Sequence, residues 1–334
     1  MSRAALSGKS YCRFCLKAVS RRSTARVGII DCHLVVTQLF KGLSILPKLE
    51  YLIVLAREKH FGRAAEACGV TQPSFSAAIR TLEDMVGLPL VIRSSRFQGF
   101  TPEGEVMLDW ARRITSDVRA MHDEVTSLRH GLSGVMRLAV IPTALAVVAD
   151  LTTPFRALHP NVRFNVQSCT SAEVLQRLVN AEIDAGITYL DNEPVAKTRF
   201  IPLYDERYYL LTAKTAPLGD REKVSWAEIA SIPLCLLTPD MQNRRIIDRL
   251  LHQSGTTVVP VLESNSIVVL VSHVKTGKWA CVLPEKLLSA FGLGEELSSI
   301  PIIHPEEVHK VGLVIAERTP LSPLTAALFA LMGK

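Results

Sequence analysis

Residues 61–80 read FGRAAEACGVTQPSFSAAIR, which is the pattern of two short helices joined by a tight turn. Gly69 supplies the conformationally free residue that such a turn often requires. Thr71 stands at an N-cap position, and Pro73 follows in the first helical turn, where a missing N–H costs nothing. The pattern therefore predicts a second helix that begins near Gln72.

The second helix has an apolar and a polar face. Its apolar residues recur every three or four positions and are expected to face inward: Phe75, Ile79, Leu82 and Val86. The outward residues are small or form hydrogen bonds: Gln72, Ser74, Ser76, Ala77 and Arg80. Such a face suits the major groove of DNA, where amide, hydroxyl and guanidinium groups reach base edges and phosphates. An ordinary helical hairpin with a solvated polar side is the alternative.

The sequence after this helix favours a DNA-binding helix-turn-helix over an ordinary helical hairpin. Residues 88–102 form two short extended runs around a turn that carries Arg93 and Arg96, which is typical of a basic wing beside the phosphate backbone. Base readout would fall to Gln72, Ser74 and Ser76. The full set of candidate DNA-binding residues is Thr71, Gln72, Pro73, Ser74, Ser76, Arg80, Arg93 and Arg96.

From about Ile45 onward the chain resembles the LysR-type transcriptional regulators. The motifs that carry this resemblance are Ala64-Ala65, Thr71-Gln72-Pro73-Ser74, Ser76, Leu82-Glu83, Gly87, Leu90, Arg93 and Thr101-Pro102-Glu103-Gly104. Two positions depart from the family pattern. Gly62 stands where a serine commonly caps a helix, and Val91 where an aromatic residue usually packs the wing.

The resemblance implies an α+β multidomain fold. A winged helix-turn-helix domain would occupy residues 45–103, with the helix-turn-helix at 61–80 and the wing at 88–102. A dimerising linker helix would occupy 104–131, and a two-lobed α/β effector-binding domain would occupy 135–334. Such a regulator is cytoplasmic. It binds an interrupted palindrome in double-stranded DNA, responds to a small molecule, and contacts RNA polymerase where it activates. The resemblance leaves open the effector, the target genes and the sign of regulation.

The positive charge is concentrated at the amino-terminal end. Residues 1–102 contain 15 Lys and Arg against 6 Asp and Glu, whereas residues 103–334 contain 23 against 26. A basic segment that coincides with the helix-turn-helix predicts salt-dependent attraction to phosphate. At 334 residues, 48% of them hydrophobic, the chain is long enough for two or three domains with their own cores.

Residues 1–44 are a separate question. They are basic, and Asp31 and His33 interrupt their apolar run, so they do not match a secretory signal. We expect a disordered extension or a start assigned too early, with a phosphate-touching arm as the alternative. Cys12, Cys15, Cys32 and His33 lack a second pair with zinc-finger spacing, so no metal site is expected. The odd total of seven cysteines favours a reducing compartment.

The stretch after the wing is an amphipathic helix. Its apolar residues alternate in steps of four and three, which is a heptad seam. The seam, and hence the candidate dimer contact, consists of Met107, Ala111, Ile114, Val118, Met121, Val125 and Leu128. Packing on its own domain is the alternative. Pairing of two copies into a dimer, or a dimer of dimers, would place two recognition helices on related half-sites.

Beyond residues 131–134, GLSG, strands alternate with helices in two successive units, which predicts parallel strands. Residues 204–214 and 309–317 are expected to cross between the units. A cleft between two lobes would bind a ligand at strand ends and helix N-termini. The candidate effector-binding residues there are Thr143, Thr170, Ser171, Tyr189, Thr238, Asn243, Arg244 and Asn265. Each could instead be an ordinary helix cap. The arginine suggests an anionic effector.

Catalysis is not expected. The sequence contains no G-x-S-x-G, P-loop, G-x-G-x-x-G or H-E-x-x-H motif, so we predict no enzyme activity and no cofactor. No stretch has the charge-free apolar length that spans a bilayer, and no membrane partner is expected. The alternative function is a transport-type binding protein without a specific DNA target.

Overall fold

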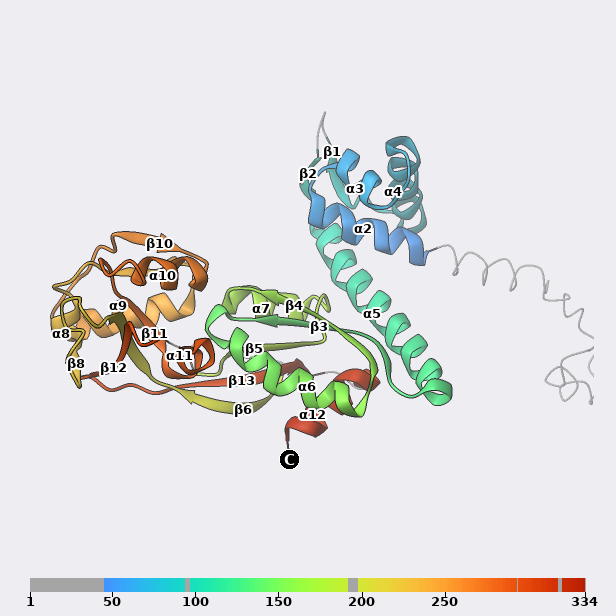
Figure 1. Ribbon diagram of the computed structural model, residues 1–334. Helices are drawn as coiled ribbons and strands as arrows, with labels where there is room; N and C mark the ends of the chain where they lie inside the picture. Colours follow the sequence, from blue (N-terminus) through green and yellow to red (C-terminus); the bar gives the residue numbers. More distant parts are fainter. Residues whose placement is uncertain (1–44, 94–96, 192–197, 293, 318–319, 334) are drawn as a thin grey trace, which may run out of the picture. The chain divides into compact units, whose positions relative to one another are not determined.

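The computed structural model describes residues 45–93, 97–191, 198–292, 294–317 and 320–333. Its amino-terminal part is a winged helix-turn-helix (Figure 1). The elements are α2 (Leu46–Glu58), α3 (Phe61–Ala67), α4 (Gln72–Val86), β1 (Val91–Arg93) and β2 (Phe97–Phe100).

Helix α4 begins and ends where the local sequence requires. Gly69 adopts a left-handed φ of 66° in the turn, and the Thr71 hydroxyl accepts a hydrogen bond from the backbone N–H of Ser74. Gly87, with φ 77°, ends the helix. Of the expected inward stripe, Phe75, Ile79 and Leu82 are fully buried. Val86 was expected to be buried, but this is wrong: it is 38% exposed, because it is the last residue of α4 before the chain turns away.

Aromatic side chains join the wing to the helices. Tyr51 stacks on Phe75 at 5.1 Å between ring centroids, and Phe61 meets Phe75 edge to face. Phe61 also contacts Phe97, which in turn contacts Phe100. The phenylalanines of β2 therefore supply the aromatic packing that Val91 does not, while Val91 itself is buried.

Three residues of the family signature hold the wing against the neighbouring helices α4 and α5 (Pro102–His130). The Glu83 carboxylate accepts hydrogen bonds from the backbone N–H groups of Leu90 and Val91, at 3.0 and 3.2 Å. Thr101 caps the next helix by accepting from Gly104 N–H, and its hydroxyl donates to the Pro89 carbonyl. A Cβ on Gly104 would lie 2.0 Å from the Leu90 carbonyl oxygen, so only glycine fits this approach.

The long helix α5 (Pro102–His130) follows and ends at Gly131. It then leads directly into the first strand of the carboxy-terminal part. The helix spans the range expected for the linker, with its start two residues earlier and its end one residue earlier.

The carboxy-terminal part has two lobes. Lobe I is built on a five-stranded sheet with the order β4-β3-β5-β13-β6. Its elements are β3 (Ser133–Val140), η1 (Pro142–Val147), α6 (Val148–Leu158), β4 (Asn161–Ser168), α7 (Ser171–Val179), β5 (Ala185–Tyr189), β6 (Thr198–Glu206), β13 (His309–Ala316) and α12 (Pro323–Met332).

Lobe II is built on a four-stranded sheet with the order β11-β7-β12-β8 and on the parallel pair β9 and β10. Its elements are β7 (Tyr208–Ala213), β8 (Val224–Ser225), α8 (Trp226–Ile229), β9 (Cys235–Leu237), α9 (Gln242–Gln253), β10 (Leu262–Ser264), α10 (Ile267–Val274), β11 (Cys281–Pro284), α11 (Glu285–Phe291) and β12 (Leu297–Ile303).

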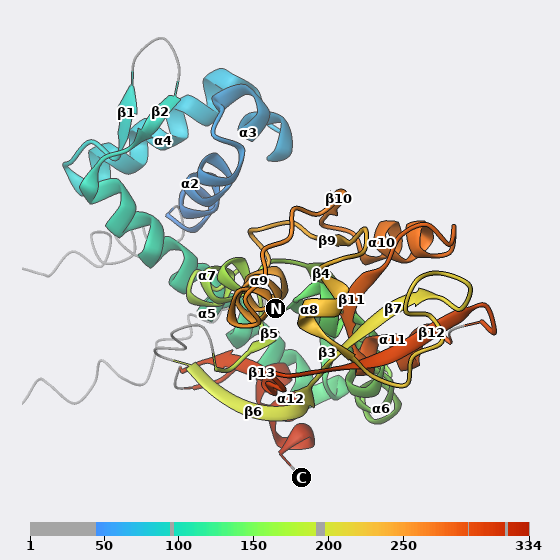
Figure 2. The ribbon, with the colours of Figure 1, turned by 90° about the vertical axis from the view of Figure 1, so that its left-hand side faces the viewer.

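The chain crosses between the lobes as expected, but the sheets are mixed rather than parallel. Strands β3, β4 and β5 are parallel, whereas β13 pairs antiparallel with both β5 and β6 (Figure 2). The mixture arises because crossing strands return in the opposite direction to the strands of each α/β unit. One hydrophobic core includes buried residues of both lobes, among them Phe155 of lobe I and Trp226 of lobe II.

We predict that Gly104→Ala loosens the wing. The added methyl group meets the backbone of Leu90, which cannot move without disturbing β1, so we expect a loss of about 1–3 kcal/mol in local stability. Hydrogen–deuterium exchange across residues 82–104 measures this directly. The exposed neighbour Glu103→Ala is the control. Equal protection in the two variants would contradict the close-approach argument.

Candidate functional site

The amino-terminal end of α4 presents polar side chains to solvent. Thr71, Gln72, Pro73, Ser74 and Arg80 are exposed, and Ser76 is half-buried. The Thr71 hydroxyl lies 2.9 Å from that of Ser74, so two of the candidate DNA contacts bond to each other as well as to the helix end. Arg93 lies in β1, although its side chain is outside the described part, and Arg96 lies outside the described residues.

The amino-terminal end of α3 is capped by a residue that sequence reasoning missed. The Nδ1 atom of His60 accepts hydrogen bonds from the backbone N–H groups of Gly62 and Arg63, at 3.1 and 3.3 Å. Histidine is not among the usual N-cap residues, and it stands one position before the helix. Its role explains how the helix begins without the serine that Gly62 replaces.

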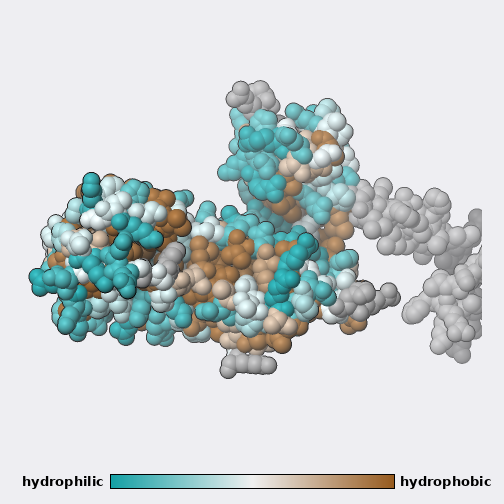
Figure 3. Space-filling model, in the orientation of Figure 1, coloured by the Kyte–Doolittle hydropathy of each residue, from teal (hydrophilic) through white to brown (hydrophobic). Residues whose placement is uncertain are grey.

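Helix α5 carries an apolar stripe that is exposed in the single chain. Figure 3 shows apolar residues in brown along part of this helix. Two of the seven predicted seam residues point inward, because Ala111 is buried and Met107 half-buried. The exposed stripe consists of Val106, Trp110, Ile114, Val118, Met121, Val125 and Leu128. The seam predicted from the sequence therefore agrees with the exposed stripe from Ile114 to Leu128, whereas Val106 and Trp110 stand in place of the predicted Met107 and Ala111.

A cleft of about 840 Å³ lies between the lobes, within the size range of small-molecule sites. Lobe I contributes the start of η1 and the turn from β4 into α7. Lobe II contributes the starts of α9 and α10, together with α11. The lining residues are Pro142, Leu145, Ala146, Ser168, Cys169, Thr170, Glu173, Arg177, Asp240, Met241, Asn265, Ser266, Ile267, Val268, Leu287 and Ala290.

Two of the eight candidate effector residues, Thr170 and Asn265, line this cleft. Thr170 is also a helix cap: its hydroxyl accepts from Glu173 N–H, while the Glu173 carboxylate accepts from Thr170 N–H. Ser171 is buried beside it, and its hydroxyl has no hydrogen-bond partner within the described residues. The buried polar atoms of Thr238 and Asn243 are likewise without partners there.

Arg244 does not line the cleft. Its charge is instead paired within lobe II. Its guanidinium donates to Asp248 at 2.8 Å, to Glu263 at 2.6 Å and to the Leu237 carbonyl. Bonds to the two carboxylates raise the pKa of Arg244 against the opposing effect of burial. Arg177 is the arginine that does line the cleft, and its guanidinium donates to Gln167.

Thr143 and Tyr189 belong to a buried polar cluster at the junction of the lobes. The Tyr189 hydroxyl donates to the Glu206 carboxylate, and Tyr208 and Tyr204 donate to the same group at 3.3 and 3.4 Å. The Thr143 hydroxyl lies 3.5 Å from that of Tyr189. Burial raises the pKa of Glu206 to about 7, although the surrounding hydroxyls lower it. Sequence reasoning assigned no role to Glu206.

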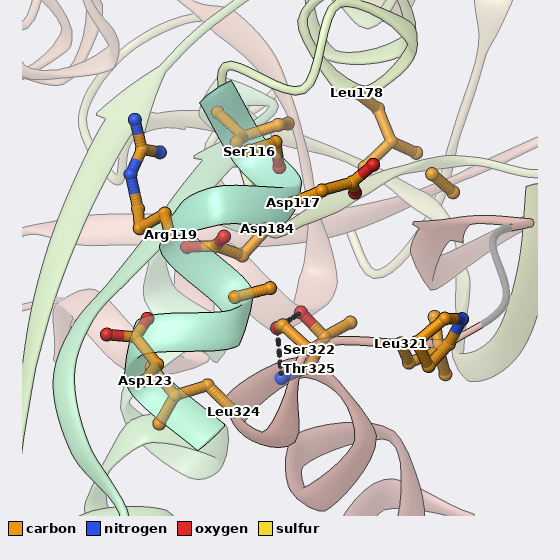
Figure 4. A pocket seen from close by; sticks show the side chains of 14 residues that line it. Ser116, Asp117, Arg119, Asp123, Leu178, Asp184, Leu321, Ser322, Leu324 and Thr325 are labelled. Atoms are coloured by element: carbon orange, nitrogen blue, oxygen red, sulfur yellow. Dashed lines mark hydrogen bonds between the residues drawn. The ribbon is translucent and has the colours of Figure 1, made fainter. Parts of the chain in front are cut away.

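A second cavity, between α5 and lobe I, is too small for a metabolite at about 60 Å³ (Figure 4). Arg119 and Asp123 of α5 lie on one side, and Asp184 precedes β5. Asp184 accepts a hydrogen bond from Arg137 N–H at 2.7 Å, while burial raises its pKa. This arrangement fits a structural contact rather than a ligand site.

Metal-binding and membrane-spanning features are absent from the part of the chain that the structure describes. Within the described residues, no group of three or more His, Cys, Asp or Glu is placed to hold a metal ion. Cys12, Cys15, Cys32 and His33 lie outside those residues. No described helix has the length and apolarity needed to cross a membrane.

Comparison with known proteins agrees with the two parts of the chain. Residues 46–105 match the model of the bacterial regulatory helix-turn-helix proteins of the lysR family, and residues 129–334 match that of the LysR substrate binding domain. The DNA-binding transcriptional dual regulator OxyR of Escherichia coli K12 is 29% identical over 276 residues, covering 82% of this chain and 90% of OxyR. The uncharacterised HTH-type regulator YybE of Bacillus subtilis is 25% identical, covering 83% and 94%.

Solved structures share the fold. A full-length OxyR point variant from Pseudomonas aeruginosa superposes with a TM-score of 0.66 at 22% identity, covering 86% of this chain and 97% of that one. CbnR, a LysR family transcriptional regulator, gives 0.60 at 16% identity with the same coverage. The chain therefore belongs to the LysR family of bacterial transcriptional regulators, which bind DNA through a helix-turn-helix and carry an effector-binding domain.

Proposed function

We propose that this regulator binds an interrupted palindromic promoter site as a dimer or tetramer. Its contacts with DNA change when a small anionic metabolite binds in the cleft between its lobes. The observation that carries the proposal is the cleft of about 840 Å³ lined by both lobes. A ligand there contacts the two lobes at once and can favour one hinge angle over another. Such a protein acts in the cytoplasm and, as an activator, contacts RNA polymerase.

Helix N-termini support the anionic preference. The amino-terminal ends of α7 and α10 open at the cleft wall, where backbone N–H groups and the helix dipole favour negative charge. Ser266 precedes α10 and makes no side-chain cap bond. Arg177 adds a positive charge on the lobe I side of the cleft. Of the two carboxylates that also line the cleft, Glu173 is already engaged by Thr170 N–H, and Asp240 lies on the lobe II side. Arg177 thus takes the place that the sequence suggested for Arg244.

A metabolite suits the cleft better than an oxidant does. Several similar proteins are hydrogen peroxide-inducible genes activators, and peroxide reacts with thiolates of lowered pKa. Burial instead raises the pKa of Cys169, the thiol that lines this cleft. Cys235 and Cys281 lie on neighbouring strands, and both are fully buried. A hydrogen bond with Cys281 lowers the pKa of Cys235, but all three thiols are buried, so they lack the solvent access that a peroxide sensor needs.

The exposed stripe of α5 supports dimerisation. Met121 and Val125 are 59% and 60% exposed in the single chain, and large apolar residues gain free energy when a second helix covers them. Because Ala111 is buried in its own chain, Trp110 is the better candidate contact at that turn.

We predict that Gln72→Ala removes discrimination between specific and random DNA, because an amide that reads a base contributes about 1–3 kcal/mol. Arg80→Ala should weaken binding to every sequence and lower the salt slope by about one, as expected for a lost phosphate contact. Arg156→Ala, an exposed arginine of α6, is the control. Footprinting and salt titrations of the full-length protein test the division of roles. Equal losses on both DNAs in the two variants would reject it.

We predict that Val125→Glu separates the dimer. A charge buried without a partner in an apolar seam costs about 3–5 kcal/mol, which should shift a micromolar sample towards monomers. Sedimentation velocity measures the change. His122→Glu introduces the same side chain at an exposed position of α5 outside the stripe and should leave the assembly intact. Dissociation by both variants, or by neither, would argue against this interface.

We predict that Val268→Trp blocks effector binding by filling the cleft. Val268 is 64% exposed and lines the cleft, so a larger side chain can occupy that space without disturbing the core. Calorimetry with a panel of small mono- and dicarboxylates should show binding to the wild type and at least a tenfold weaker affinity in the variant. The control, Val259→Trp, changes an exposed valine of the same lobe that does not line the cleft. Carboxylate binding that survives Val268→Trp would place the effector elsewhere.

A further inference from the structure

The two lobes meet at a hinge made by two crossings of the chain. Strand β6 of lobe I ends at Glu206, and β7 of lobe II begins at Tyr208, so Arg207 alone separates the two strands. The chain returns between Ile303 of β12 and His309 of β13. Any rotation of one lobe against the other must change the backbone at these crossings.

Side chains from both lobes converge on Glu206 at this hinge. Tyr189 and Tyr204 belong to lobe I, whereas Tyr208 belongs to lobe II, and all three hydroxyls donate to the one carboxylate. Tyr208 also contacts the ring of Trp226, whose indole N–H donates to the Pro305 carbonyl in the second crossing, at 3.0 Å. The carboxyl group therefore lies among groups that a lobe rotation displaces.

The same cluster adjoins the cleft. Thr143 contributes a hydroxyl to the cluster and is the neighbour of Pro142, which lines the cleft. Both residues belong to η1, and η1 lies against α11 of lobe II, whose residues Leu287 and Ala290 line the cleft as well. A change at Glu206 can therefore reach the cleft through one short helix.

A buried carboxyl that binds its proton more tightly than it would in water stabilises the conformation that buries it only while it stays protonated. Ionisation favours any conformation in which water reaches the carboxylate. We propose that Glu206 is a proton-dependent latch, which holds the hinge packed when neutral and favours a looser, hydrated hinge when ionised. Its ordinary pKa of 4.5 is raised to about 7, so the change falls in the physiological range.

Other titratable groups surround the cluster. His309 of β13 contacts the rings of Tyr189 and Tyr208, and burial lowers its pKa from 6.5. Glu307 lies 3.5 Å from His309 and pairs with Arg249 of α9 at 2.6 Å. The tyrosines keep their protons across neutral pH, because burial raises their pKa values above 10. Glu206 and His309 are thus the groups whose titration must be separated by experiment.

Trp226 provides the measurement. In full-length protein with Trp110 and Trp279 replaced by Phe, fluorescence of Trp226 should shift to longer wavelength with a midpoint near pH 7 as water enters the hinge. Hydrogen exchange at residues 204–209, corrected for its intrinsic pH dependence, should accelerate over the same range. Glu206→Gln, a neutral isostere, should abolish both transitions, and Tyr208→Phe should move the midpoint to higher pH because it removes a donor to the ionised form.

His309→Gln and Glu307→Gln are the controls, and both should retain the transition. The free energy of unfolding gives a second readout: it should fall as pH rises from 4.5 to about 7, and Glu206→Gln should remove that slope. A wild type without a transition, or a transition that persists in Glu206→Gln, would overturn the latch. Should Glu206→Gln fail to fold, an unmoved midpoint in Tyr208→Phe would do the same. The consequence for the cleft rests on the proposed function, whereas this titration needs neither effector nor DNA.

Discussion

The crossing from β6 to β7 places Glu206 where the two lobes of the effector-binding domain meet, and the cleft depends on the angle set there. Cys169 and Thr170 reach the cleft from lobe I, and Asn265 and Val268 reach it from lobe II. These side chains form one site only while the hinge holds the lobes at the appropriate angle. The Glu206 carboxyl holds this angle only weakly in its ionised form. Burial disfavours the negative charge, and the hydrogen bonds from the surrounding hydroxyls offset only part of the desolvation cost.

Helix α4, which carries the candidate base-reading residues, is positioned by a helix cap and by apolar packing. Gln72 and Ser74 are exposed at the start of α4, and their positions follow from the Thr71 cap and from the buried residues Phe75 and Ile79. The wing is held by backbone hydrogen bonds to Glu83 and by the close approach of Gly104 to Leu90. Neither Glu83 nor Gly104 faces outward to read DNA. Their presence in the family signature is explained by the geometry of the wing.

Local features of the fold could be predicted from the sequence, and long-range ones could not. Gly69 and Thr71 act on backbone within a few residues, so their roles follow from the sequence nearby. Arg244 is different: Glu263, one of its two partners, belongs to another strand, and only the folded lobe shows that its charge is satisfied. The antiparallel return of β13 and the two inward residues at the start of the α5 seam likewise depend on tertiary packing.

The cleft and the hinge are joined by direct contacts along the short helix η1. A ligand against Pro142 touches the helix that carries Thr143, and Thr143 takes part in the hydrogen bonding of Glu206. A ligand that favours the packed hinge must therefore also favour the protonated carboxyl. The factor by which the ligand strengthens proton binding at Glu206 equals the factor by which protonation strengthens ligand binding. The reciprocity follows from thermodynamics once both events bias the same two conformations. Physical contact along η1 gives that coupling a structural basis, since the helix borders both sites.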